Sequence, residues 1–145
     1  MAATRARVVV ALHKPRGVVT TRTDPEGRPT VYSLLDGLDA HVVPVGRLDL
    51  ATSGLLLLTN DTRLADWLTS PATAIPRVYL VTVRGRVSDV DAGRLAGGVE
   101  SRGERLAALS AVVRKASARE SHLVVTLTEG GTVRSVACWR PSVTR

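Results

Sequence analysis

Short apolar runs separated by Pro- and Gly-rich turns set the pattern of this chain. The β-branched run over 7–13 and the leucine run over 54–59 predict buried strands, the second covered on both faces. Residues 77–84 alternate as a strand, and 105–115 and 122–128 predict two adjacent antiparallel strands. Strands dominate without a regular βαβ rhythm, so the pattern predicts an α+β fold with a mixed, mostly antiparallel sheet and flanking short helices.

Three short helices are expected between these strands, over residues 31–35, 63–69 and 88–95. Thr30 is placed to cap the first helix, and Asn60 or Asp61 the second. Ser88 and Asp91 have the spacing of a capping box at the start of the third.

Length and composition narrow the class of protein. The 145 residues are 44% hydrophobic and 23% charged, which is typical of one globular domain. A single cysteine, Cys138, excludes an internal disulfide or a multi-cysteine zinc site, and the three histidines lack ligand spacing, so we expect no metal. No apolar run is long enough to span a bilayer and no secretory segment is visible. We therefore expect a cytoplasmic monomer with no membrane association.

The charge favours a polyanionic partner. The formal net charge is +7, and the second half (73–145) carries twelve basic and six acidic residues. Arginine outnumbers lysine 18 to 2, and its planar guanidinium pairs bidentately with phosphate. A basic surface that only keeps the protein soluble, and an arginine bias set by a GC-rich genome, remain alternatives. Two Tyr and two Trp with no Phe argue against a platform that stacks several bases.

The densest candidate chemistry lies in residues 44–61. Asp49 stands in a loop bounded by Gly46 and Gly54, at the entrance to the leucine strand and two residues after Arg47. A partly desolvated carboxylate kept ionised by nearby cations suits a nucleophile or general base, and Arg47 suits a phosphate. An ordinary loop aspartate that bonds its own turn is the alternative. Nucleophile-elbow, Walker and dinucleotide-binding motifs are absent from the sequence.

The run Gly46-Arg47-Leu48-Asp49, followed by Thr52, Gly54 and the leucines, resembles the catalytic motif of the pseudouridine synthases. The RsuA-like group, whose members act on ribosomal RNA, is the most similar. Three further stretches agree in order and spacing, over residues 13–20, 24–31 and 77–85. The resemblance covers about residues 7–130. Many members also carry an S4 RNA-binding module, which we do not expect in this sequence. The resemblance implies a single catalytic domain over 1–145.

The resemblance also implies roles for individual residues. Asp49 would be the nucleophile that attacks a flipped-out uridine, at C6 of the base or at C1′ of the sugar. Tyr79 would stack on the uracil and assist proton removal from C5; an inward-facing strand aromatic is its alternative. The residues expected to lie at the RNA are Arg47, Lys14 and Arg77. The family usually has lysine at the position of Arg77, and Lys14 is also expected to shape the loop that follows it. The reaction is an isomerisation that implies no cofactor and no metal, with ribosomal RNA as partner.

The end of the chain departs from the family pattern. The family's last motif carries a basic residue that pairs with the catalytic carboxylate, and Arg134 is the best match for it. We therefore expect Arg134 within salt-bridge reach of Asp49, although residues 131–145 are divergent and the chain ends early. A catalytically silent RNA-binding relative of the same fold is the alternative function, and an inactive fragment is a remoter one.

Overall fold

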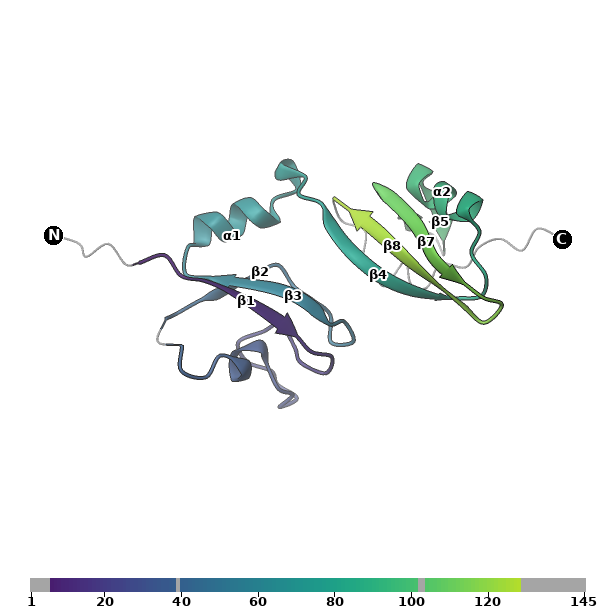
Figure 1. The fold of residues 1–145 in the computed structure, drawn as a ribbon. Helices are drawn as coiled ribbons and strands as arrows, with labels where there is room; N and C mark the ends of the chain where they lie inside the picture. The colour runs from purple at the N-terminus through teal and green to yellow at the C-terminus, as the bar shows by residue number, and fades with distance from the viewer. Residues whose placement is uncertain (1–5, 39, 102–103, 129–145) are drawn as a thin grey trace. The chain divides into compact units, whose positions relative to one another are not determined.

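The computed structural model describes residues 6–38, 40–101 and 104–128, and it divides into two compact units, Met1–Thr73 and Ala74–Arg145. The named strands pair antiparallel in three small sheets, and the described ranges contain two α-helices (Figure 1). This confirms the α+β class. A single domain over 1–145 stays a prediction, and none of the helices seen is long and apolar enough to cross a membrane.

A three-stranded sheet organises the first unit. Strand β3 (Gly54–Thr59) lies between β1 (Val9–Lys14) and β2 (Val43–Val45). The register pairs the end of β1 with the start of β3, so that Lys14 is opposite Gly54. Helix α1 (Thr62–Thr69) follows β3, and short 3-10 helices cover Val31–Leu34 and Pro71–Thr73. The first of these is shorter than predicted, and the Thr30 side chain makes no capping hydrogen bond.

The core of the first unit covers one face of β3. Leu56 and Leu58 are buried against Val18, Val31 and Val42. The prediction that β3 is covered on both faces is wrong at its start, where Leu55 is 68% exposed. Successive side chains of a strand point to opposite faces, so a continuous leucine run does not by itself bury both.

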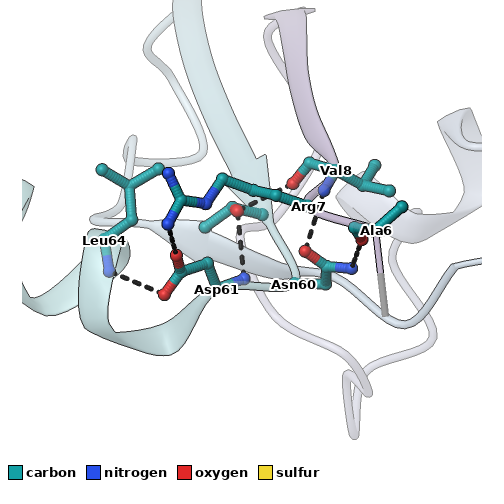
Figure 2. Close-up of polar contacts among 7 residues, drawn as sticks. Ala6, Arg7, Val8, Asn60, Asp61 and Leu64 are labelled. Carbon is teal, nitrogen blue, oxygen red and sulfur yellow. Dashed lines mark hydrogen bonds and ion pairs between the residues drawn. The ribbon is translucent and has the colours of Figure 1, made fainter. Parts of the chain in front are cut away.

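Polar contacts at the end of β3 fix the start of α1 (Figure 2). Asp61 is the N-cap, because its side chain accepts the Leu64 N–H at 3.1 Å. It also pairs with Arg7 at 2.9 Å. Asn60 instead accepts the Val8 N–H at 2.9 Å, which ties the chain before β1 to the end of β3.

A second three-stranded sheet organises the second unit. Its order is β4 (Arg77–Arg84), β8 (Glu120–Leu127) and β7 (Ser110–Ala116). Helix α2 (Asp89–Gly97) begins with the predicted capping box, in which the Ser88 hydroxyl accepts the Asp91 N–H at 3.1 Å. A small hairpin pairs β5 (Val99–Ser101) with β6 (Glu104–Leu106).

The predicted strand over 105–115 is divided into β6 and β7. The break follows from a tertiary contact, because the Ala108 N–H bonds to the Leu95 carbonyl at the end of α2, at 3.1 Å. Leu109 then donates to Thr126 and starts the pairing of β7 with β8. The core packs one face of this sheet against α2, through Val81, Val83, Leu95, Leu123 and Val125 among others.

We predict that Asp61→Asn reduces the loss of stability in acid. The Leu64 N–H and the charge of Arg7 hold the pKa of Asp61 below its ordinary value of 3.8. The unfolded chain therefore binds this proton more readily, so the carboxylate's contribution is present above about pH 5 and is lost as the pH falls toward about 2. Asparagine keeps a cap acceptor but does not titrate. Urea unfolding across this range measures the difference.

Asp36→Asn is the control, because Asp36 is exposed and its side chain bonds to none of the described residues. It should follow the wild type through the whole range. If Asp61→Asn follows the wild type as well, the carboxylate of Asp61 contributes nothing to the acid sensitivity.

Candidate active site

The loop that carries Asp49 joins β2 to β3. Gly46 (φ +77°) and Gly54 (φ +149°) bound it in conformations that other residues rarely adopt. Arg47 and Asp49 are both exposed on it, and the Asp49 side chain makes no hydrogen bond or ion pair with the residues that the structure describes. The loop therefore presents an exposed carboxylate two residues after an exposed guanidinium, neither of them ion-paired within the described ranges.

The backbone of this loop is held on both sides of Asp49. The Thr20 hydroxyl donates to the Leu48 carbonyl at 2.9 Å and accepts the Leu48 N–H at 3.3 Å. On the other side, the Gly17 N–H donates to the Leu50 carbonyl at 2.8 Å. Both partners belong to the segment that follows β1. Two stretches that the family resemblance singled out separately, 13–20 and 46–54, are thus one hydrogen-bonded structure.

Lys14, the last residue of β1, is fully buried beneath the same segment. Its Nζ donates to the Val18 carbonyl at 2.7 Å and to the Pro15 carbonyl at 3.0 Å. Burial lowers the pKa of Lys14, and the negative charge of Asp49 acts against that shift. The ammonium is thus bonded to the turn, which favours the predicted role of Lys14 in shaping its loop. The RNA contact of Lys14 stays a prediction.

A groove of about 390 Å³ lies beside Arg47 within the first unit. Pro44 and Val43 form its apolar part, and α1 supplies Thr62, Asp66 and Thr69. Arg47 is not ion-paired to any described residue, so its guanidinium is available to a phosphate or base edge placed there. The position of Arg47 in this groove is compatible with an RNA contact, which stays a prediction.

Tyr79 and Arg77 lie on β4, in the second unit. Tyr79 is half-buried and packs against that unit's core, as the alternative of an inward strand aromatic requires. Its neighbours Val78 and Leu80 point to the opposite, exposed face of the strand. Stacking of Tyr79 on a uracil and RNA contact by Arg77 stay predictions.

Arg134 falls outside the described residues, so its pairing with Asp49 also stays a prediction. Within the described part, the charge of Asp49 acts on Lys14, where it opposes the lowering of the lysine pKa by burial. Sequence reasoning missed Thr20, since its partner Leu48 is 28 residues away and no spacing marks the pair. The same part of the chain holds no group of three or more His, Cys, Asp or Glu residues arranged to bind a metal ion.

An exposed carboxylate on a doubly anchored loop, beside an arginine with no ion-pair partner among the described residues, is a candidate catalytic site in an α+β protein of net charge +7. The sequence profile of the RNA pseudouridylate synthases matches residues 8–134. The chain belongs to this family. The predicted membership is confirmed.

Curated relatives carry the name ribosomal large subunit pseudouridine synthase B. The Yersinia pestis protein is 47% identical over 93 residues, which is 63% of this chain and 29% of the relative. The Xylella fastidiosa (strain 9a5c) protein is 52% identical over 80 residues, 54% of this chain and 17% of the relative. The chain thus spans less than a third of the length of these relatives.

A solved structure described as a crystal structure of pseudouridylate synthase has a similar fold. It superposes with a TM-score of 0.70 at 30% identity, and the match covers 89% of this chain and 54% of that one.

We predict that Lys14→Met lowers the free energy of unfolding by about 1–3 kcal/mol, because the Val18 and Pro15 carbonyls lose their donor. Lys115→Met is the matched control. Lys115 is the other lysine of the sequence and lies exposed on β7, so its loss should change stability by no more than about 0.5 kcal/mol. Urea denaturation measures both, and equal effects would mean that the buried ammonium does not support the turn.

Proposed function

We propose that this chain isomerises a uridine of ribosomal RNA to pseudouridine, with Asp49 as the nucleophile. The observation that carries the proposal is the Asp49 loop, which is anchored on both sides and leaves the carboxylate exposed and without a bond to the described residues. Family membership and the names of the curated relatives give the reaction and the class of RNA. Members named for the large ribosomal subunit favour that subunit's RNA as the substrate.

The reaction breaks the bond between N1 of uracil and C1′ of ribose and forms a bond between C5 and C1′. A proton leaves C5 and one is taken up at N1, so the product has the same atoms and the same oxidation state. No redox group or metal is needed for this balance. A covalent adduct with Asp49 would hold the base if it forms at C6, or the ribose if it forms at C1′, while the base turns. The bond to Asp49 breaks again before the product leaves.

A uridine inside folded RNA must leave its stack before Asp49 can reach it. Arg47 is the residue proposed to contact the backbone or to fill the space left by the extruded nucleotide. Tyr79 is proposed to stack on the uracil and to assist removal of the C5 proton, with Arg77 on the same strand near the RNA. Arg134 is proposed as the cation that pairs with Asp49.

The second unit adds an exposed basic surface that supports an RNA partner. The pairing of β7 with β8 shifts register between Val113 and Lys115, which leaves Arg114 as an extra residue. Arg114 and Lys115 are both exposed, and neither forms an ion pair with a described residue. The bulge therefore places two adjacent free cations on one strand.

The first test replaces Asp49 with Asn. This change keeps the size of the side chain but removes the nucleophile, so turnover should fall to background while RNA binding persists. Release of tritium from ribosomal RNA labelled at uridine C5 measures turnover, and filter binding measures affinity.

Asp36→Asn serves as the control for the loss of one exposed carboxylate in the same unit, away from the groove beside Arg47, and it should retain turnover. Retained turnover in Asp49→Asn would disprove the proposed nucleophile. Binding without turnover in the wild type would instead favour the silent RNA-binding relative.

The second test uses salt. Each phosphate contact releases condensed counterions, so RNA affinity should fall steeply between low and moderate salt. Arg114→Gln should reduce the slope of log affinity against log salt by about 0.7–0.9. Arg94→Gln, which removes an arginine already paired with Asp91 on α2, should leave the slope nearly unchanged. Equal slopes for both variants would show that Arg114 does not contact phosphate.

A further inference from the structure

We propose that Thr20 is a positioning residue for Asp49: its hydroxyl fixes the backbone of Leu48 and thereby directs the neighbouring carboxylate. The inference rests on the proposed function, in which Asp49 reacts. It assigns a role to a residue outside the loop that carries the chemistry.

The Thr20 hydroxyl satisfies both backbone groups of one residue. Its Oγ1 donates to the Leu48 carbonyl and accepts the Leu48 N–H, at 2.9 Å and 3.3 Å. A hydroxyl can do both because it carries one donor and two acceptor lone pairs. Thr20 is 8% exposed, so competing water is largely excluded from these bonds. The Thr20 side chain thus bonds to the backbone of Leu48 as a neighbouring strand would in a sheet.

The bonds flank Asp49 closely. Leu48 is held by Thr20 on one side, and Leu50 is held by the Gly17 N–H on the other. The carbonyl of Asp49 itself accepts the Thr52 N–H at 2.9 Å. The Asp49 backbone is therefore constrained before, at and after the residue, while its carboxylate stays free of described partners. This is the arrangement expected of a preorganised reacting group.

Thr20 is itself held by the core of the first unit. The preceding residue, Val19, accepts the Val31 N–H and donates to the Pro29 carbonyl, both at 3.0 Å. Val18 is buried in the core, and its carbonyl accepts Lys14 Nζ. Packing and main-chain bonds therefore fix the position of the Thr20 hydroxyl. Its two hydrogen bonds then fix the backbone of Leu48.

The predicted consequence is a loss of rate more than of binding. A misplacement of about 1 Å in a reacting group can cost a hundredfold in rate. Thr20→Val keeps the shape of the side chain but removes both hydrogen bonds. We expect kcat to fall about tenfold to a hundredfold, with KM for RNA changed much less. Thr20→Ser restores the hydroxyl and should recover most of kcat.

The chain offers a matched control in Thr59. This residue is fully buried in the same unit, and its Oγ1 donates to the Val8 carbonyl at 2.7 Å and accepts the Asp61 N–H at 3.1 Å. It lies at the opposite end of β3 from the Asp49 loop. Thr59→Val therefore removes the same pattern of bonds, and should reduce stability without lowering kcat.

Steady-state tritium release from C5-labelled ribosomal RNA, at a temperature where circular dichroism shows every variant folded, gives kcat and KM. The proposal is supported if kcat falls in Thr20→Val, recovers in Thr20→Ser and is retained in Thr59→Val. It is overturned if Thr20→Val keeps its kcat, if Thr59→Val loses as much, or if serine does not restore the rate.

A second measurement separates this proposal from the proposed function. If the wild type turns over no ribosomal RNA, the proposed function fails, and ¹⁵N relaxation of the Asp49 amide in the protein alone then decides the positioning role. Exchange broadening should rise in Thr20→Val and stay at the wild-type level in Thr59→Val and Thr20→Ser. An unchanged Asp49 amide in Thr20→Val overturns the role of Thr20.

Discussion

The organisation of the first unit depends on hydrogen bonds between the turn after β1 and the loop before β3. Lys14 ends β1 opposite Gly54, the first residue of β3, so the turn after β1 and the loop before β3 lie at the same end of the sheet. Three hydrogen bonds then join the turn to the loop, two between the Thr20 hydroxyl and Leu48 and one from the Gly17 N–H to the Leu50 carbonyl. The turn and the loop at this end of the sheet therefore form one connected structure and not two independent loops. Asp49 lies between its two attachment points.

The buried ammonium of Lys14 joins the stability of the turn to the electrostatics of the site. Burial of a charge is costly unless its hydrogen bonds are made, and the Val18 and Pro15 carbonyls provide them. The negative charge of Asp49 acts on this ammonium, because it opposes the lowering of the Lys14 pKa by burial. One buried residue therefore shapes the segment that positions the carboxylate and also interacts with its charge.

The sequence predicted the strands and the capped helices well, because periodicity and capping are local properties. Asp61 and Ser88 cap α1 and α2 as their spacing indicates. The division of β6 from β7 was not predictable, since it follows from a bond between Ala108 and Leu95. Motif resemblance singled out the Asp49 loop but did not predict the burial of Lys14, because a lysine at a turn looks the same in sequence whether its ammonium meets RNA or buried carbonyls. A contact between separate elements decided the first case. In the second, the bonds of Lys14 are local, and its burial in the folded unit decided the outcome.

Amide hydrogen exchange at Gly17 and Leu48 of the wild-type protein tests the central claim most directly, because these two N–H groups form the attachments on either side of Asp49. We predict that both amides exchange far more slowly than the amide of Arg47, the exposed residue that precedes Leu48 and whose N–H bonds to none of the described residues. Exchange of Gly17 and Leu48 at the rate of an unprotected chain would contradict the account, since the loop that carries Asp49 would then be unattached.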